Sequence, residues 1–293
     1  MFIITKDKFN YIAIILALAA AALIASSRGR MLKASSVADE PEISFPVVMY
    51  HSVSSKYDRL NDYVLNISEL ERDLKHIQSN GYETVLFREI LEWQKSGDAK
   101  MHVEKPIVIV FDDGFYNNYS LVMPLFEEYG MKFCLSVVGS YIDKETELGD
   151  PQAEYYSYCT WDQLKEMHES GNVELFNHSY NMHVNGARRG VLQKGSESNE
   201  AYLQALTQDI LKCQGMLDSI GATHRMYAYP FGFYSKKTEE ALIGLGFNVS
   251  LSCATGVNHI AKSTPLMLIK RYNRPHGISS ETFFRPMFSA LEK

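Results

Sequence analysis

Apolar stretches alternate with amphipathic stretches along the chain from Phe45 towards its C-terminus. The apolar stretches are short and rich in β-branched and aromatic residues, which is typical of strands, whereas the others repeat apolar residues at helical spacing. We therefore predict strands at residues 45–51, 83–86, 106–111, 132–138, 172–176, 226–229, 247–251 and 266–270. We predict helices at residues 68–80, 90–93, 117–129, 160–171, 201–220 and 235–245 and from residue 280 onward.

The alternation of strands and helices predicts the fold class. Seven or eight strands separated by helices are typical of an α/β fold, and they favour a single (β/α) barrel over two domains. The 293 residues are enough for one large domain with a substantial core. This domain is expected to cover residues 45–293.

An apolar run from Tyr11 to Ala25 precedes this domain. The run is shorter than the roughly 20 residues that a membrane-spanning helix usually needs, and it also resembles the core of a signal peptide. We predict a signal anchor or transmembrane segment at residues 1–27 and a tether at residues 28–44. The protein would then lie at the cell membrane with the domain of residues 45–293 outside the cytoplasm, or be secreted if the segment is cleaved.

Charge and cysteine content narrow the classes of partner. The net charge is -6, and no basic cluster follows the first thirty-odd residues, so nucleic acid is not expected as a partner. The four cysteines show neither CxxC pairs nor zinc-like spacing, and no disulfide framework is predicted. No feature of the sequence indicates a protein partner.

Two adjacent acids, Asp112 and Asp113, end the central predicted strand and are followed by Gly114. The strand is apolar throughout, as strands buried on both faces of a parallel sheet are. Because ligands bind at the carboxyl ends of such strands, the two acids are candidate site residues. The alternative is that they only begin a turn or cap the next helix.

Two histidines, His178 and His183, follow the strand predicted at residues 172–176. On a helix their imidazoles would point in different directions, so they can share a ligand only if they lie on a loop. Two imidazoles and one carboxylate of the Asp pair would form a catalytic zinc-type site that leaves one position to water. Alternatively, the two histidines are structural or exposed.

A third candidate stretch, Tyr229-Pro230-Phe231-Gly232, follows the strand predicted at residues 226–229. Proline and glycine together favour a tight turn, which needs no further function. The stretch would also form one wall of a site if its strand ends beside those of the acids and histidines.

The chain resembles the polysaccharide deacetylase family, the NodB-like enzymes of carbohydrate esterase family 4. Four of its motifs occur in the family's order: MYHSV at residues 49–53, FDDG at 111–114, HSYNMH at 178–183 and YPFG at 229–232. Two features resemble the poly-N-acetylglucosamine deacetylase branch most. One is the four-residue gap between the two histidines, and the other is the tyrosine-histidine motif at the first predicted strand. The resemblance implies a distorted barrel that removes acetyl groups from N-acetylated amino-sugar polymers with one divalent metal.

The resemblance also implies roles for individual residues. Asp113, His178 and His183 would bind the metal, with zinc expected first and cobalt, nickel or iron as alternatives. Asp112 would be the general base that takes a proton from the attacking water. The oxyanion or the substrate would be bound around Tyr229, Pro230 and Phe231, with a backbone N–H near Tyr229 as donor. Arg271 is also predicted to bind the substrate or the oxyanion.

Two departures from the common family pattern leave roles open. The usual C-terminal histidine motif is absent, so the general acid is His51, as on the poly-N-acetylglucosamine deacetylase branch, or a C-terminal histidine such as His259 or His276. Ala228 stands where the family usually has an arginine, and Arg271 is the candidate replacement that would orient Asp112.

We therefore predict a metal-dependent hydrolase that acts on carbon-nitrogen bonds other than peptide bonds. Its substrate would be an N-acetylhexosamine polymer of the cell envelope, either peptidoglycan or an exopolysaccharide. The alternatives are a catalytically silent barrel that binds glycan, and a deacetylase of the same family that acts on an O-acetylated or a small non-sugar substrate.

Overall fold

The computed structural model describes residues 40–57, 59–149, 153 and 156–292. The predicted membrane segment, residues 1–27, and most of the predicted tether lie outside the described residues. None of the helices in the described part of the chain is both long and apolar enough to cross a bilayer.

Among the described residues, nine strands form the main sheet, and all of its pairings are parallel. The order is β12-β10-β9-β8-β7-β6-β2-β13, and β5 pairs with the start of β6. The strands are β2 (Val47–Tyr50), β5 (Glu83–Thr84), β6 (Pro106–Phe111), β7 (Phe133–Val137), β8 (Val173–Asn177), β9 (Met226–Ala228), β10 (Val249–Leu251), β12 (Leu266–Ile269) and β13 (Tyr272–Asn273).

The two ends of this strand path are neighbours in the sequence. Only Lys270 and Arg271 separate β12 from β13, and this link reaches at most about 11 Å. Laid flat, the path from β12 to β13 would be roughly 30 Å wide. The sheet must therefore curl, and because no β-ladder joins β12 to β13 within the described ranges, the barrel stays open there. The predicted α/β barrel is confirmed in this open, half-barrel form.

Alternation along β6 assigns its residues to the two faces of the sheet. Val108 and Val110 belong to the interior cluster, the buried apolar side chains inside the barrel, and α3 (Phe87–Lys95) packs against this cluster. Ile107, Ile109 and Phe111 belong to a second cluster, between the sheet and the outer helices. All residues of β6 are buried, which confirms the prediction of a strand covered on both faces. Asp112 follows at the next interior position, because side chains alternate with a period of two.

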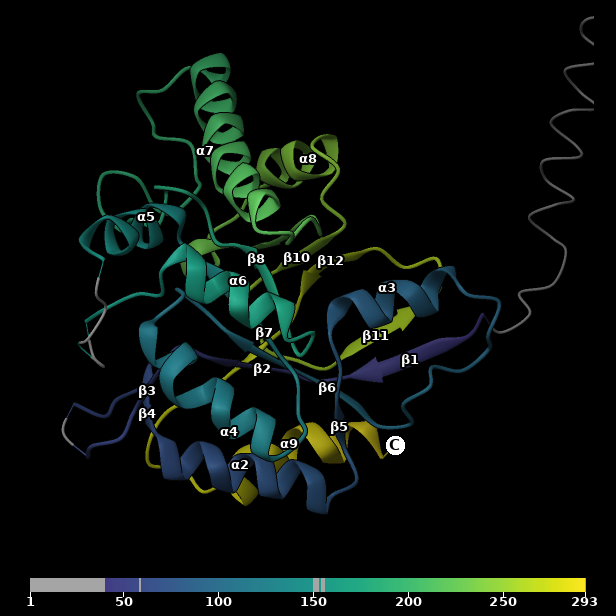
Figure 1. Cartoon of the computed structure of the whole chain (residues 1–293). Helices are drawn as coiled ribbons and strands as arrows, with labels where there is room; N and C mark the ends of the chain where they lie inside the picture. The colour runs from purple at the N-terminus through teal and green to yellow at the C-terminus, as the bar shows by residue number, and fades with distance from the viewer. Residues whose placement is uncertain (1–39, 58, 150–152, 154–155, 293) are drawn as a thin grey trace, which may run out of the picture. The chain divides into compact units, whose positions relative to one another are not determined.

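Helices cover the outer face of the sheet (Figure 1). They are α2 (Ile67–Ser79), α4 (Met123–Glu128), α5 (Gly139–Leu148), α6 (Trp161–Glu169), α7 (Asn199–Ser219), α8 (Lys236–Gly244) and α9 (Ser280–Leu291). Thr160 and Gln163 form the predicted capping box of α6. The helix predicted at residues 117–129 is divided instead, because Pro124 cannot donate an α-helical hydrogen bond; a π-helical turn, Asn118–Val122, precedes α4.

Two small pairs of strands flank the main sheet. β1 (Glu42–Phe45) pairs antiparallel with β11 (Asn258–Ala261), and β3 (Ser52–Ser54) pairs with β4 (Val64–Asn66). β1 occupies the last residues of the predicted tether, and its Ile43 and Phe45 pack on the interior cluster. It leads directly into the amino-terminal end of β2, so the β1–β11 pair lies at the amino-terminal end of the sheet.

Glu174 is a carboxyl group buried inside the sheet near the start of β8. It accepts hydrogen bonds from the N–H of Arg88 at 3.2 and 3.3 Å, and the Cys134 thiol lies 3.8 Å away. Burial raises the pKa of Glu174 to about 7 because these donors and the charge of Arg88 offset only part of the desolvation. Glu174 therefore binds its proton more tightly in the folded chain than in the unfolded one.

We expect the free energy of unfolding to fall as the pH rises from 4.5, the ordinary pKa of the group, to about 7. Over this window the folded state binds more protons at Glu174 than the unfolded state does. Glu174→Gln should remove this part of the pH dependence of stability. Chemical denaturation at several pH values between 4.5 and about 7 measures it. Glu128→Gln, at an exposed position of α4, is the control. Parallel stability profiles for the wild type and Glu174→Gln would contradict this expectation.

Candidate active site

The predicted site residues follow different strands, but their strands end at the same side of the sheet. His51 follows β2, Asp112 and Asp113 follow β6, and His178 follows β8. Arg271 lies in the link between β12 and β13. Because these strands are parallel, their carboxyl ends meet at one end of the barrel, which is where such barrels carry their sites.

Asp112 is held by two buried side chains and is only 2% exposed. Arg271 Nη1 donates to Oδ1 at 3.0 Å and to Oδ2 at 2.8 Å, and the Ser136 hydroxyl donates to Oδ1 at 2.6 Å. Burial by itself would raise the pKa of Asp112, but the charges of Arg271, His178 and His51 and the Ser136 hydrogen bond hold it well below its usual range. Asp112 is therefore a carboxylate with a fixed orientation.

Arg271 is itself 1% exposed, and its other nitrogens are also engaged. Nε donates to the Ser252 carbonyl at 2.9 Å, and Nη2 lies 3.7 Å from the Cys253 sulfur. The structure thus places Arg271 behind Asp112, in contact with it, and away from any surface that substrate can touch. The prediction that Arg271 binds substrate or oxyanion is wrong for this reason, whereas a role in orienting Asp112 fits the contacts.

Three candidate ligand atoms converge beside Asp112. Nε2 of His178 lies 3.5 Å from Asp113 Oδ1, Nε2 of His183 lies 3.1 Å from the same oxygen, and one ligand atom of each residue lies within 4.8 Å of the others. Burial lowers the pKa of His178 to about 4, so its ring is neutral near pH 7. Its Nδ1 lies 2.8 Å from the Ala228 carbonyl, which only accepts, so the single ring proton is on Nδ1.

That tautomer leaves a lone pair on His178 Nε2, and the neighbouring atom, Asp113 Oδ1, also carries lone pairs. Asp113 Oδ1 is buried without a hydrogen-bond donor in the described part of the chain. Neighbouring acceptors without a proton between them repel one another unless a cation lies between them. Two imidazoles and one carboxylate are also a donor set of catalytic zinc sites, so these residues fit a divalent cation.

The structure distinguishes among the three candidate general acids. The rings of His51 and Tyr63 pack edge to face, with 5.0 Å between their centroids. The Nδ1 atom of His51 is buried without a hydrogen-bond partner among the described residues. His259 lies on β11, at the opposite end of the sheet, where its Nδ1 is 2.7 Å from the Ser44 hydroxyl. Of these two, only His51 stands at the end of the barrel that carries the acids.

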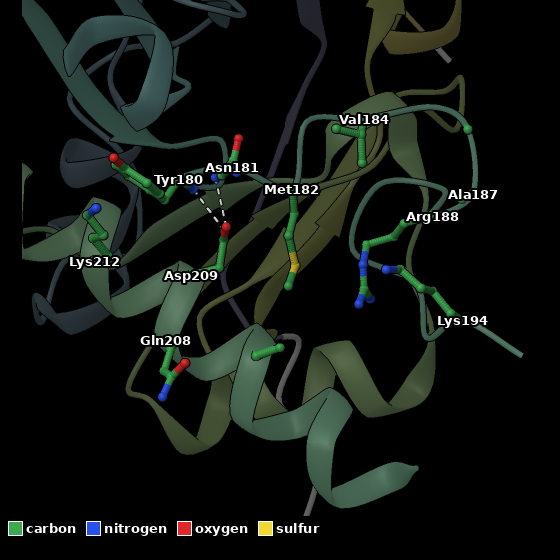
Figure 2. A pocket seen from close by; sticks show the side chains of 12 residues that line it. Tyr180, Asn181, Met182, Val184, Ala187, Arg188, Lys194, Gln208, Asp209 and Lys212 are labelled. Atoms are coloured by element: carbon green, nitrogen blue, oxygen red, sulfur yellow. Dashed lines mark hydrogen bonds between the residues drawn. The ribbon is translucent and has the colours of Figure 1, made fainter. Parts of the chain in front are cut away.

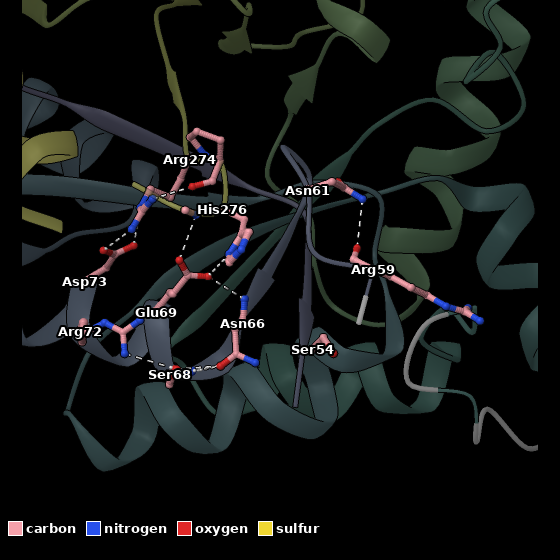
Figure 3. A network of polar contacts seen from close by, with 12 residues as sticks. Ser54, Arg59, Asn61, Asn66, Ser68, Glu69, Arg72, Asp73, Arg274 and His276 are labelled. Carbon is pink, nitrogen blue, oxygen red and sulfur yellow. Dashed lines mark hydrogen bonds and ion pairs between the residues drawn. The ribbon is translucent and has the colours of Figure 1, made fainter. Parts of the chain in front are cut away.

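His276 belongs to a different network, which Figure 3 shows. Its Nδ1 lies 2.6 Å from a carboxylate oxygen of Glu69 on α2, next to the buried ion pair of Arg274 and Asp73. This contact occupies a ring nitrogen of His276 with a structural partner. His51 is therefore the better placed candidate acid.

The stretch Tyr229–Phe231 contributes less to the site than predicted. The Tyr229 N–H donates to the Leu251 carbonyl at 3.1 Å, so this amide is not the oxyanion donor that was expected near Tyr229. Its side chain continues the alternation of β9 into the cluster under α7 and α8, where its hydroxyl donates to Glu239. Pro230 is buried and has no N–H.

Phe231 is the member of this stretch that reaches the surface. It is 43% exposed and its ring stacks on His183, with 4.5 Å between the centroids. Its backbone has a φ of +57°, which turns the chain sharply towards the histidine. Phe231 therefore supplies an apolar wall beside the metal-binding residues.

Ser136 was missed by the sequence analysis although it contacts Asp112. It lies on β7, two positions after Cys134 and hence on the same interior face. A hydroxyl in an otherwise apolar strand was the available signal, because a buried polar group needs a partner. The sequence alone did not show which partner that would be.

Comparison with known proteins agrees with this geometry. The sequence profile of the polysaccharide deacetylase family matches residues 99–250. The chain is similar to the poly-beta-1,6-N-acetyl-D-glucosamine N-deacetylase of Escherichia coli K12, with 24% identity over 272 residues; this covers 86% of the chain but only 40% of that protein. It is also similar to the putative polysaccharide deacetylase YxkH of Bacillus subtilis, with 25% identity over 83% of the chain and 76% of that protein.

Two solved structures share the fold. The de-N-acetylase of Aggregatibacter actinomycetemcomitans has a TM-score of 0.69 at 22% identity, and covers 84% of this chain and 99% of its own. The Streptococcus pyogenes deacetylase PplD, solved with acetate, has a TM-score of 0.66 at 19% identity, with 84% and 98% covered. At these identities the likeness concerns the fold alone.

Proposed function

This chain belongs to the polysaccharide deacetylase family, and we propose that it hydrolyses the N-acetyl groups of an exopolysaccharide built from N-acetylglucosamine. Several similar proteins are named poly-beta-1,6-N-acetyl-D-glucosamine N-deacetylases, which supports this polymer over peptidoglycan. The observation that carries the proposal is the fixed carboxylate of Asp112 beside the three candidate ligand atoms of Asp113, His178 and His183. An envelope polymer also agrees with the export expected from residues 1–27.

Asp113, His178 and His183 would hold one divalent cation, zinc being the first candidate. Such a cation supplies Lewis-acid chemistry: it polarises the acetyl carbonyl and makes water a better nucleophile at neutral pH. The remaining steps depend on side chains whose positions the structure gives.

Asp112 accepts the proton of the attacking water. Its low pKa keeps it ionised at neutral pH, and Arg271 and Ser136 orient it from behind, so that its remaining lone pairs are available to water. His51 gives a proton to the amine nitrogen as the carbon-nitrogen bond breaks, since an amine leaves much more easily than an amide anion. Phe231 covers His183 and limits the access of bulk water from that side.

We expect the full chain to release acetate from β-1,6-linked N-acetylglucosamine oligomers, to lose this activity with a chelator, and to regain it with Zn²⁺. His178→Ala should be inactive and bind less metal, because it removes one of three ligands. His102→Ala is the matched control, because His102 is exposed and lies away from the carboxyl ends of the strands. Acetate is measured enzymatically, and bound metal by mass spectrometry.

Different results would separate the alternatives. Activity that survives both the chelator and His178→Ala would contradict the metal-dependent mechanism. Acetate released only from peptidoglycan fragments would keep the mechanism and replace the polymer. Binding of oligomers without turnover by the zinc-loaded chain would favour a glycan-binding barrel.

A further inference from the structure

The loop that carries both metal-binding histidines is fixed at its first histidine by the sheet. The N–H of His178 donates to the Val137 carbonyl at 2.9 Å, and its Nδ1 donates to the Ala228 carbonyl. The chain then reverses at Ser179, whose φ is +73°, and the Ser179 N–H donates to Asn177 Oδ1 at 2.9 Å. Strands β7, β8 and β9 therefore determine where the His178 ring lies.

His183 has no comparable attachment to the sheet among its described contacts. Its ring stacks on Phe231, and the Tyr141 hydroxyl lies 3.5 Å from Nδ1 and 3.3 Å from the His183 carbonyl oxygen. These distances are longer than those of ordinary O–H hydrogen bonds. The position of His183 thus depends on the path that the chain takes through residues 179–182.

Asp209, in the middle of α7, binds the N–H groups of that path, whereas the carbonyls of Ser179 and Tyr180 accept from the first N–H groups of α5 at 3.0 and 2.8 Å. Its Oδ1 accepts the Tyr180 N–H at 2.8 Å and its Oδ2 accepts the Asn181 N–H at 2.7 Å, as Figure 2 shows. Both bonds are charge-assisted and therefore stronger than those between neutral groups. The Tyr180 side chain is fixed as well: its hydroxyl donates to Asp143 at 2.8 Å, and the Lys212 ammonium lies 3.7 Å from the ring centroid.

We propose that Asp209 is a positioning residue for metal binding: by fixing two amides between His178 and His183, it sets the distance between the two imidazoles. The proposal rests on the proposed metal-dependent deacetylation. A carboxylate is required because both of its oxygens accept. An asparagine would retain one acceptor and would turn an NH₂ group towards a backbone N–H.

The surroundings of Asp209 allow its removal without loss of the fold. A cavity of about 590 Å³ opens beside it, lined in part by Asn181, Met182 and Gln208. Water from this cavity can bind the two amides when the carboxylate is absent. Water does not fix their direction, however, so the loop would stay folded but less well ordered.

The test measures Zn²⁺ affinity of the full chain by competition with a chromogenic chelator. We expect Asp209→Ala to weaken Zn²⁺ binding by about 10- to 100-fold, as the loss of partners behind metal ligands usually does. Asp209→Asn should lie between Asp209→Ala and the wild type. Gln208→Ala, the exposed neighbour that lines the same cavity, should bind like the wild type.

Two further readouts distinguish positioning from a general structural role. The visible spectrum of the Co²⁺ form should change in Asp209→Ala, because it reports the geometry of the ligands, while thermal unfolding of the metal-free protein should stay close to that of the wild type. Wild-type Zn²⁺ affinity in a folded Asp209→Ala would overturn the proposal, as would a loss of affinity that only follows a loss of metal-free stability. A wild-type chain that binds no Zn²⁺ would overturn the proposed function and this inference together.

Discussion

Asp112→Asn is expected to lower kcat for acetate release by about 10²- to 10⁴-fold, the usual contribution of a general base. The substitution keeps the shape of the side chain, and its amide oxygen can still accept from Arg271. It cannot take a proton from water, however. Because Asp112 is not one of the three residues that converge on the cation position, Zn²⁺ binding should persist.

The measurement compares kcat and Zn²⁺ content in Asp112→Asn and in Asp98→Asn, an exposed acid of the loop after α3. The control should match the wild type in both. If Asp112→Asn retains more than about a tenth of wild-type kcat, another group is the base, because a loss that small falls below the range for general base catalysis. A parallel loss of bound Zn²⁺ would instead make Asp112 part of the metal site.

Arg271→Met is expected to destabilise the fold by about 3–5 kcal/mol near neutral pH, and to reduce kcat as well. Methionine fills much of the volume but leaves Asp112 buried without its counter-charge. The pKa of Asp112 should then rise, since burial is no longer opposed by Arg271. The carboxylate would also lose the two contacts that orient it.

The sign of the pH dependence follows from these pKa changes. In the wild type the lowered pKa of Asp112 adds stability at pH values above its ordinary pKa of 3.8, and this contribution is lost as the pH falls through the folded-state pKa. In Arg271→Met the pKa of Asp112 is higher, so the variant keeps less of this contribution than the wild type does at pH values above 3.8. The difference between the two proteins should therefore grow from acid to neutral pH.

Urea denaturation at several pH values measures this difference. Arg225→Met is the matched control, because its ion pair with Asp218 at 2.6 Å is about one third exposed and should contribute less than about 1 kcal/mol. Adding Asp112→Asn to Arg271→Met should restore part of the lost stability by removing the unpaired charge. A difference between Arg271→Met and the wild type that does not change with pH would contradict the electrostatic explanation.

Much of the fold and the outline of the site follow from local patterns. The apolar run of β6 and the capping box at Thr160 predict elements that the structure confirms, because each depends on neighbours in the sequence. The family prediction is confirmed by the match over residues 99–250. Asp112, Asp113, His178 and His183 were predicted as candidates because they lie on loops that follow apolar strands, at the carboxyl ends where such folds bind ligands.

What the sequence did not predict depends on contacts between distant segments. The helix α5 was missed, since its exposed acidic residues leave only a weak apolar pattern, in which Ile142 is one of the few buried positions. The pairing of β1 with β11 joins the two ends of the domain and has no local signal. The hydrogen bond of the Tyr229 amide was not predicted, because its acceptor, Leu251, lies on the neighbouring strand.

The open seam between β12 and β13 has a consequence for the order in which the protein folds. Arg271 in this seam and Asp112 at the end of β6 are 159 residues apart, and β2 obtains its outer neighbour only when β13 arrives. Contacts between such distant residues form late, because the long loop between them must close first. The proposed metal ligands therefore precede in the chain the arginine that orients Asp112, and the site becomes complete only once its C-terminal strands are in place.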